Sequence, residues 1–557
     1  MPIKRRHWLV NLLGWSTGIG QAFGQTQKSA QEFICSPMPG PSFLPSCTLW
    51  PQGIEGQRKA DLGNGFFINP ILSGDHPDPT ILKDGNNYYM THSSFEACPG
   101  LLIWHSKDLL NWQPLTHALN QYIGSVWAPE LCKYQNRYFL YIPAKKTAAT
   151  LYPNDIWVIY ADRIEGPWSE PVRLGNGRID PGHAVGEDGQ RYLFLSGGLQ
   201  VPLSSDGLSI TGHETHVYEG WTYPSEWDVE AYSQEGPKIL NFDGWYHMVL
   251  AVGGTAGPPT SHMVICARSR SIHGPWTNHP HNPVIKTRHA GERWWSKGHG
   301  TLVQGPNEKD WYLLYHGYEA GFHTLGRQTL MMPMRYTDDG WFEASHDSES
   351  DPLPAPQGGR KLPHGMPLSD SLEGPQLGPQ WSFYRGGAPE LRRIKFENRK
   401  LHLQAVGTSP QNSSPLCIVA LDPAYEVEVE LSFDEGVQAG LILFYSDKLY
   451  AGVGYNERNM MLHRYGMDQR TLPKPNGMNR SLRIRLSNRW HVLTIHTSQD
   501  EGQHWEKFPI QMDVSGYHHN VAYGFMSLRP ALYASGSGKA VFSNFKYRAI
   551  ERLARAE

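Results

Sequence analysis

Three carboxylates in this 557-residue chain stand beside glycine or proline in similar settings. Asp78 lies in "HPDPTI", Asp180 in "RIDPGH" and Glu235 in "SQEGPKI". Proline fixes its own φ and restricts the residue before it, so we expect Asp78, which precedes Pro79, to hold one extended conformation. Carboxylates held at fixed positions are suited to general acid and base catalysis. Three unrelated, solvated turn acids are the alternative.

The three acids fall in a region of repeated hairpins, between residues 66 and 350. Five units each combine an apolar strand, a turn built on Gly, Asn or Asp, and an aromatic-rich strand, as in "PTILKDGNNYYMTHS". Five such units at a period of about 50 residues predict a five-bladed β-propeller, with a long β-sandwich as the alternative. The innermost strands of a propeller crowd its axis. The acids at the heads of the units are therefore expected to converge on one central cavity.

A second all-β domain is predicted beyond the hairpin region. Residues 351–367, "DPLPAPQGGRKLPHGMP", are rich in Pro, Gly and charge, which indicates a linker. From 368 to 557, segments such as "YEVEVELSF" alternate apolar and polar residues, which predicts a β-sandwich. Residues 25–65 are interpreted as an extension that precedes the propeller.

The N-terminus has the pattern of an export signal. Arg5 and Arg6 precede a short apolar stretch that ends in Ala22-Phe23-Gly24, a small-x-small cleavage pattern. The paired arginines suit the twin-arginine type. We expect residues 1–24 to be removed and the protein to be periplasmic or secreted, with a cytoplasmic tail as the alternative.

The six cysteines include no CxxC pair, which argues against a zinc site. Cys35 and Cys47 can form a disulfide in an exported protein. The other four are expected to be single buried thiols.

Composition narrows the possible partners. The formal net charge is -3 and no long basic run is present, so no nucleic-acid partner is expected. No segment is long and apolar enough to predict a membrane span. Aromatic residues make up 12% of the chain, and such side chains stack on flat apolar faces, including sugar rings. The sequence does not indicate an oligomeric state.

The motifs "HPDPTI", "WAPEL", "IDPG", "QEGPKI", "GHGTLV" and "LGRQTL" follow one another in this order. In them, residues 66–345 resemble glycoside hydrolase family 43, and the tail resembles the concanavalin-like sandwich (jelly roll) of its β-xylosidases and arabinofuranosidases. The resemblance implies an inverting mechanism with Asp78 as general base, Glu235 as general acid and Asp180 as the residue that tunes and orients the acid. Such a mechanism needs an ionised base and a protonated acid roughly 6.5–9.5 Å apart. A charge on Asp180 would raise the pKa of Glu235 and keep it protonated.

The same resemblance implies a sugar pocket around these acids. Phe95 in "HSSFEACPG" and Trp127 in "VWAPEL" are expected to wall the pocket, with ordinary core positions as the alternative. Arg327 in "LGRQTL" is expected to donate hydrogen bonds to sugar hydroxyls or to Asp180.

His299 in "KGHGTLV" is expected near the channel axis, where some relatives hold a calcium ion or a water cluster. A satisfied structural histidine is the alternative. Glu130 in "WAPEL" is assigned no chemistry, and no cofactor is expected to be required.

The resemblance implies an exo-glycosidase that removes terminal β-D-xylosyl or α-L-arabinofuranosyl residues from xylan, arabinoxylan or their oligosaccharides. The sandwich favours a β-xylosidase slightly, because its loops close the pocket in similar enzymes. An arabinofuranosidase or arabinanase acting on arabinan is one alternative. A non-catalytic, lectin-like protein is another, but it would not need all three carboxylates.

Overall fold

The computed structural model describes residues 50–146, 154–466, 468–473 and 481–550. The predicted export signal and the predicted Cys35–Cys47 disulfide lie outside these residues. Among the described residues, no helix is long and apolar enough to cross a membrane. The helical segments described are short: η1 (Ile54–Gly56), η2 (His323–Leu325), α1 (Ala388–Leu391) and η3 (Pro410–Asn412).

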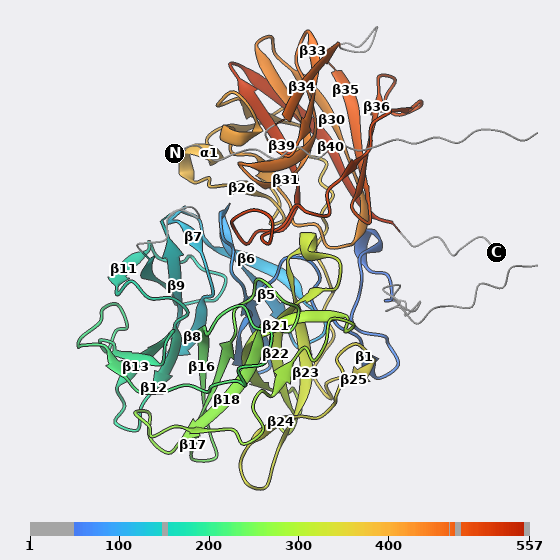
Figure 1. Ribbon diagram of the computed structural model, residues 1–557. Helices are drawn as coiled ribbons and strands as arrows, with labels where there is room; N and C mark the ends of the chain where they lie inside the picture. Colours follow the sequence, from blue (N-terminus) through green and yellow to red (C-terminus); the bar gives the residue numbers. More distant parts are fainter. Residues whose placement is uncertain (1–49, 147–153, 467, 474–480, 551–557) are drawn as a thin grey trace, which may run out of the picture. The chain divides into compact units, whose positions relative to one another are not determined.

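Five antiparallel sheets in the described residues form the predicted propeller (Figure 1). The first sheet contains β2 (Thr80–Asp84), β3 (Asn87–Thr91), β5 (Gly100–Ser106) and β6 (Gln113–Leu119). The second contains β7 (Ser125–Val126), β8 (Glu130–Tyr134), β9 (Arg137–Lys145), β10 (Asn154–Ala161) and β11 (Val172–Gly175). The third contains β12 (Gly182–Val185), β13 (Arg191–Leu195), β14 (Leu199–Pro202) and β15 (Thr215–His216). The fourth contains β16 (Gln234–Phe242), β17 (Trp245–Val252), β18 (Met263–Ser269), β19 (Thr277–Asn278) and β20 (Ile285–Lys286). The fifth contains β21 (Trp294–Gln304), β22 (Trp311–Glu319), β23 (Arg327–Tyr336) and β24 (Phe342–Ala344).

The D-G turns close hairpins as the sequence predicts. Phe242 pairs with Trp245 across the turn between β16 and β17, which leaves Asp243 and Gly244 as its two central residues. Their φ values are 53° and 68°, as a two-residue type I′ turn requires. The innermost strands of the five sheets contact one another in turn, from β2 through β8, β12 and β16 to β21 and back to β2. The ring is therefore closed, and the start of each innermost strand faces one axis.

Two further sheets form the predicted sandwich. One contains, in spatial order, β34 (Asp468–Pro473), β33 (Asn459–Arg464), β32 (Leu449–Tyr455), β31 (Val437–Ser446), β39 (Arg529–Gly536), β29 (Leu416–Cys417), β26 (Ser382–Tyr384) and β4 (Ala97–Cys98). The other contains β27 (Ile394–Glu397), β28 (Lys400–Gln404), β40 (Lys539–Ala549), β30 (Ala424–Phe433), β35 (Ser481–Arg489), β36 (Val492–Ser498) and β37 (Glu506–Lys507), with β38 (Met512–Asp513) beside β36. Strand β4 comes from a propeller loop, so the sandwich sheet extends directly onto the first blade.

The predicted linker packs against the residues that precede the propeller. Within it, β25 (Leu353–Pro354) pairs with β1 (Phe66–Phe67). Leu353 and Met366 are buried, and the side chain of Gln57 donates a hydrogen bond to the carbonyl oxygen of Met366. Composition alone indicated a linker, but these buried apolar side chains attach the segment to the protein core.

Four of the cysteines, Cys98, Cys132, Cys266 and Cys417, are buried free thiols, which confirms the prediction for them.

Candidate active site

Asp78 lies just before β2, the innermost strand of the first blade. Its φ is 56°, in the left-handed region, so the expectation of an extended conformation is wrong. The neighbouring structure offsets the cost of this conformation, because the backbone N–H of Asp78 donates a 3.1 Å hydrogen bond to Nδ1 of His316. The same nitrogen lies 2.9 Å from Oδ1 of Asp78. Long-range contacts, rather than the flanking prolines alone, aim this carboxylate.

The carboxylate of Asp78 is buried and held ionised. Arg327 donates a hydrogen bond of 2.8 Å to Oδ1, and the hydroxyl of Ser93 donates one of 2.5 Å to Oδ2. Burial by itself would raise the pKa of Asp78, but Arg327, His299 and His316 together hold that pKa well below its usual value. Among the three acids, Arg327 donates its hydrogen bond to Asp78, so the alternative in which it donates to Asp180 is wrong. Donation to sugar hydroxyls stays a prediction.

Asp180 and Glu235 lie at the heads of the third and fourth blades. Asp180 precedes β12 with a φ of 58°, and Glu235 is the second residue of β16. The backbone N–H of Gly236 donates a 3.2 Å hydrogen bond to Oδ2 of Asp180, and the hydroxyl of Ser233 donates one of 3.0 Å to Oε2 of Glu235. The structure thus places the two carboxylates at the heads of adjacent innermost strands.

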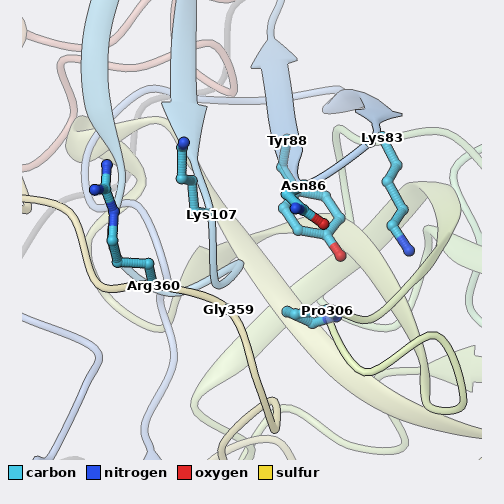
Figure 2. A pocket seen from close by; sticks show the side chains of 8 residues that line it. Lys83, Asn86, Tyr88, Lys107, Pro306, Gly359 and Arg360 are labelled. Atoms are coloured by element: carbon cyan, nitrogen blue, oxygen red, sulfur yellow. The ribbon is translucent and has the colours of Figure 1, made fainter.

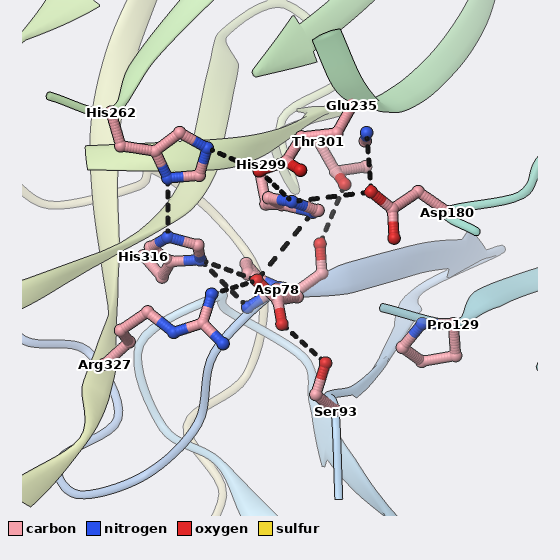
Figure 3. A network of polar contacts seen from close by, with 12 residues as sticks. Asp78, Ser93, Pro129, Asp180, Glu235, His262, His299, Thr301, His316 and Arg327 are labelled. Atoms are coloured by element: carbon pink, nitrogen blue, oxygen red, sulfur yellow. Dashed lines mark hydrogen bonds and ion pairs between the residues drawn. The ribbon is translucent and has the colours of Figure 1, made fainter. Parts of the chain in front are cut away.

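His299, on β21, lies between all three acids (Figure 3). Its Nδ1 is 3.8 Å from Oδ1 of Asp78, and its Nε2 is 3.8 Å from Oδ2 of Asp180 and 3.5 Å from Oε1 of Glu235. Burial lowers the pKa of His299, but the surrounding carboxylates outweigh burial and raise it to about 9. His299 is therefore a buried cation at neutral pH, and it links the acids electrostatically.

The Asp180–Glu235 pair holds its proton differently from the expectation. Burial, and the charges of Glu235 and Asp78, raise the pKa of Asp180 to about 7 although His299 opposes them. Burial would also raise the pKa of Glu235, but contacts with His262 and His299 hold it well below its usual value. These opposite shifts mean that the two coupled carboxylates hold a single proton between them near neutral pH in the ligand-free protein. The pattern of acids in the sequence could not show this, because the two histidines decide it.

Two histidines that the sequence analysis missed complete the site. His262 Nε2 lies 3.1 Å from Oε1 of Glu235, and His262 Nδ1 lies 3.2 Å from His316 Nε2. Both rings are fully buried. Gly298 makes room for His262, since a Cβ at residue 298 would lie 2.3 Å from its ring. The available signal was a histidine inside the apolar strand "WYLLYHGYE", because a buried imidazole needs a polar partner.

Aromatic side chains from both domains meet beside the acids. Phe95 is stacked on Phe525 with ring centroids 6.0 Å apart, and Trp127 meets Phe525 edge-on at 5.8 Å. Phe525 belongs to the sandwich and was missed by the sequence analysis. Its loop is anchored by a buried ion pair of 2.9 Å between Arg529 and Asp75, and Asp75 lies three residues before Asp78. The sandwich therefore contributes one side chain to the predicted wall.

The residues near His299 do not fit the calcium ion considered from the resemblance. One ligand atom from each of Glu235, His262 and His299 lies within 4.8 Å of the others. Calcium takes six to eight oxygen ligands, whereas two of these three donors are imidazoles.

A separate cavity of about 370 Å3 lies beside the turn between β2 and β3 (Figure 2). None of the acids described above lines it. Its lining residues are Lys83, Gly85, Asn86, Tyr88, Lys107, Pro306, Gly359 and Arg360.

Comparison with known proteins identifies two matching regions. Residues 67–342 match the glycosyl hydrolases family 43, and residues 369–548 match the β-xylosidase C-terminal concanavalin A-like domain. A xylan 1,3-β-xylosidase from a Vibrio species is 31% identical in an alignment of 311 positions, which covers 49% of this chain and 56% of that relative. A non-reducing end α-L-arabinofuranosidase from Bacteroides ovatus is 27% identical in an alignment of 526 positions, which covers 88% of this chain and 94% of that protein.

A solved structure agrees with these matches. The crystal structure of a GH43 protein from Bacillus licheniformis superimposes with a TM-score of 0.77 at 27% identity, over 87% of this chain and all of that one. The two matching regions, in this order and with this fold, show that the chain belongs to the glycosyl hydrolases family 43 and carries the family's β-xylosidase-type C-terminal domain.

Proposed function

We propose that this chain is an inverting exo-glycosidase that removes terminal β-D-xylosyl or α-L-arabinofuranosyl residues from xylan, arabinoxylan or their oligosaccharides. The arrangement around His299 is the observation that carries the proposal. On one side, Asp78 is ionised and held by Arg327; on the other, Asp180 and Glu235 share one proton near neutral pH. An inverting glycosidase needs an ionised base and a proton-bearing acid of this kind.

Each group then has a defined part in the reaction. Asp78 removes a proton from a water molecule, whose oxygen attacks the anomeric carbon. The bond from that carbon to the leaving oxygen breaks, and Glu235 gives this oxygen its proton. His299 contacts both Asp180 and Glu235, so it provides a route by which the proton on Asp180 reaches Glu235. No covalent sugar–enzyme bond is formed, which gives inversion.

The aromatic side chains beside the acids and the similarity to known glycosidases both support the proposed substrate class. Phe95, Trp127 and Phe525 enclose the side of the site that faces the sandwich, which favours a pocket for a terminal sugar over an open groove. β-Xylosidase activity is the first candidate, because the C-terminal domain matches the β-xylosidase type. α-L-Arabinofuranosidase activity is the second, because the Bacteroides ovatus relative matches over nearly the whole of its length.

We also propose that the enzyme is exported and that hydrolysis uses the protein's carboxylates without a cofactor. The Arg5-Arg6 pair and the small-x-small pattern support export. The carboxylates of Asp78 and Glu235 supply both proton transfers, so the reaction as written requires no further group. The expected partner is a neutral xylo- or arabino-oligosaccharide.

Release of 4-nitrophenol from the β-D-xylopyranoside and the α-L-arabinofuranoside tests the proposal. Purified wild type is compared with Asp78→Ala and Glu235→Ala, and NMR records the anomer formed first. Turnover that Asp78→Ala abolishes, with an inverted product, is the expected result. Folded wild type that binds arabinoxylan oligosaccharides but hydrolyses none of these substrates would identify a lectin instead.

A further inference from the structure

A buried ion pair joins two of the innermost strands of the propeller close to the three acids. Glu130 is the first residue of β8 and Lys238 lies in β16, and Lys238 Nζ is 2.5 Å from Oε2 of Glu130. Both side chains are about nine-tenths buried. Strands β8 and β16 are not neighbours in the ring, because β12 lies between them. The pair therefore joins the second blade directly to the fourth.

Lys238 also contacts the segment that follows Asp180. Lys238 also donates to the carbonyl oxygens of Pro129, at 2.9 Å, and of Pro181, at 3.2 Å. Pro181 directly follows Asp180, and Lys238 itself lies three residues after Glu235.

Glu130 makes the corresponding contacts with the first and third blades. The hydroxyl of Thr80, two residues after Asp78, donates a 3.1 Å hydrogen bond to Oε2 of Glu130. The backbone N–H of His183, three residues after Asp180, donates one of 3.2 Å to Oε1. One ion pair thus contacts the chain within three residues of every acid of the site.

We propose that Glu130 and Lys238 are positioning residues that set the separation of Asp78, Asp180 and Glu235, an inference that rests on the proposed glycosidase function. Neither residue lies among those expected to contact the sugar. Catalysis depends steeply on distance, since a displacement of about 1 Å can cost on the order of 100-fold in rate. Removing one partner leaves the other as an uncompensated buried charge, which must move or recruit water. The blades that carry the acids would then shift.

Lys238 has a second, electrostatic effect that separates positioning from general stability. Its charge is one of the influences that lower the pKa of Asp180, opposing the upward effect of burial. Replacing Lys238 with an uncharged side chain therefore moves the alkaline limb of the pH–rate profile to higher pH. A loss of stability alone would not move this limb.

The test compares Glu130→Gln, Lys238→Met and the double variant with wild type on the 4-nitrophenyl substrates, well below the unfolding temperature. Each single variant is expected to lower kcat about tenfold or more with little change in KM. The double variant is expected to be no worse than the worse single variant, because no unpaired charge remains. Lys133→Met is the matched control. It removes an ion pair with Asp84 that joins β8 to β2 near the C-terminal ends of both strands, and it should leave kcat unchanged.

Thr80→Val provides a milder variant in case the charge substitutions prevent folding. It removes one hydrogen bond to Glu130 and is expected to lower kcat several-fold without unfolding the protein. The proposal is overturned if the variants melt earlier but retain wild-type kcat, or if the alkaline limb of Lys238→Met stays in place. Inactive wild type would instead refute the proposed function, so the two failures are distinguishable.

Discussion

Arg327 Nη1 donates a 2.8 Å hydrogen bond to Oδ1 of Asp78, and this contact joins the last blade of the propeller to the head of the first. Both side chains are about 95% buried. A guanidinium is charged at every accessible pH, so it keeps the carboxylate ionised without titrating itself. The contact therefore both joins the two blades that close the ring and keeps the expected general base, Asp78, ionised.

Replacing Arg327 by Met should raise the pKa of Asp78, because a major source of its stabilisation as an anion is lost. A base must be ionised, so the acidic limb of kcat/KM should move to higher pH, and activity near pH 5 should fall further than activity near pH 8. The pH dependence of kcat/KM for the nitrophenyl substrate measures this shift. An acidic limb that stays at the wild-type position would show that Arg327 does not control this ionisation.

The alkaline limb of the wild-type profile is expected near pH 7. The pKa of Asp180, raised first by burial, is about 7, and above this pH the Asp180–Glu235 pair loses the proton that the leaving oxygen needs. In Asp180→Asn this limb should move, since the titrating group is gone. A wild-type rate that remains constant up to pH 9 would contradict the assignment.

Asp180 should also make stability depend on pH in a defined direction. Its folded pKa of about 7 exceeds the usual 3.8, so the folded state holds the proton longer than the unfolded chain does. Stability due to this group is complete below about pH 4 and is lost as pH rises to about 7. The melting temperature of Asp180→Asn should therefore match wild type near pH 4 and exceed it at pH 8. Thermal melts of both proteins across this range provide the measurement, and a gap that is constant with pH would refute the shift.

Glu235→Ala should discriminate between leaving groups. Natural xylosides release a poor leaving group that needs a proton, and loss of a general acid typically costs on the order of 100- to 10,000-fold. Nitrophenolate needs little protonation, so hydrolysis of the nitrophenyl glycoside should be much less impaired. Steady-state kinetics on xylobiose and on the nitrophenyl substrate make the comparison. Equal losses on both substrates would assign Glu235 a role other than general acid.

Phe525→Ala should weaken substrate binding, although residue 525 belongs to the sandwich. Removing the ring takes away the stacking partner of Phe95 and the edge contact with Trp127, so KM for xylo-oligosaccharides should rise several-fold more than kcat falls. Tyr465→Ala, which removes an aromatic ring that is 43% exposed elsewhere in the sandwich, is the control. If both variants behave as wild type, the sandwich does not wall the pocket.

The sequence by itself was sufficient to predict the all-β class, the five hairpin units, the sandwich and the convergence of three acids. These features follow from local signals: period-two patterning and D-G turns such as Asp243-Gly244 depend on neighbouring residues only. The same locality limited the prediction for Asp78, whose left-handed backbone is held by His316, 238 residues away.

Only the tertiary structure decided how the site is charged and enclosed. His316 lies inside an apolar strand, His262 directly precedes one, and Phe525 comes from the other domain. The pKa values of Asp180 and Glu235 depend on burial and on the distances to His262 and His299, and neither quantity is written in residue spacing. The amino-acid sequence determines which groups are available for catalysis. The closing of the propeller ring and the docking of the sandwich loop set the distances between these groups, and those distances determine where the proton lies.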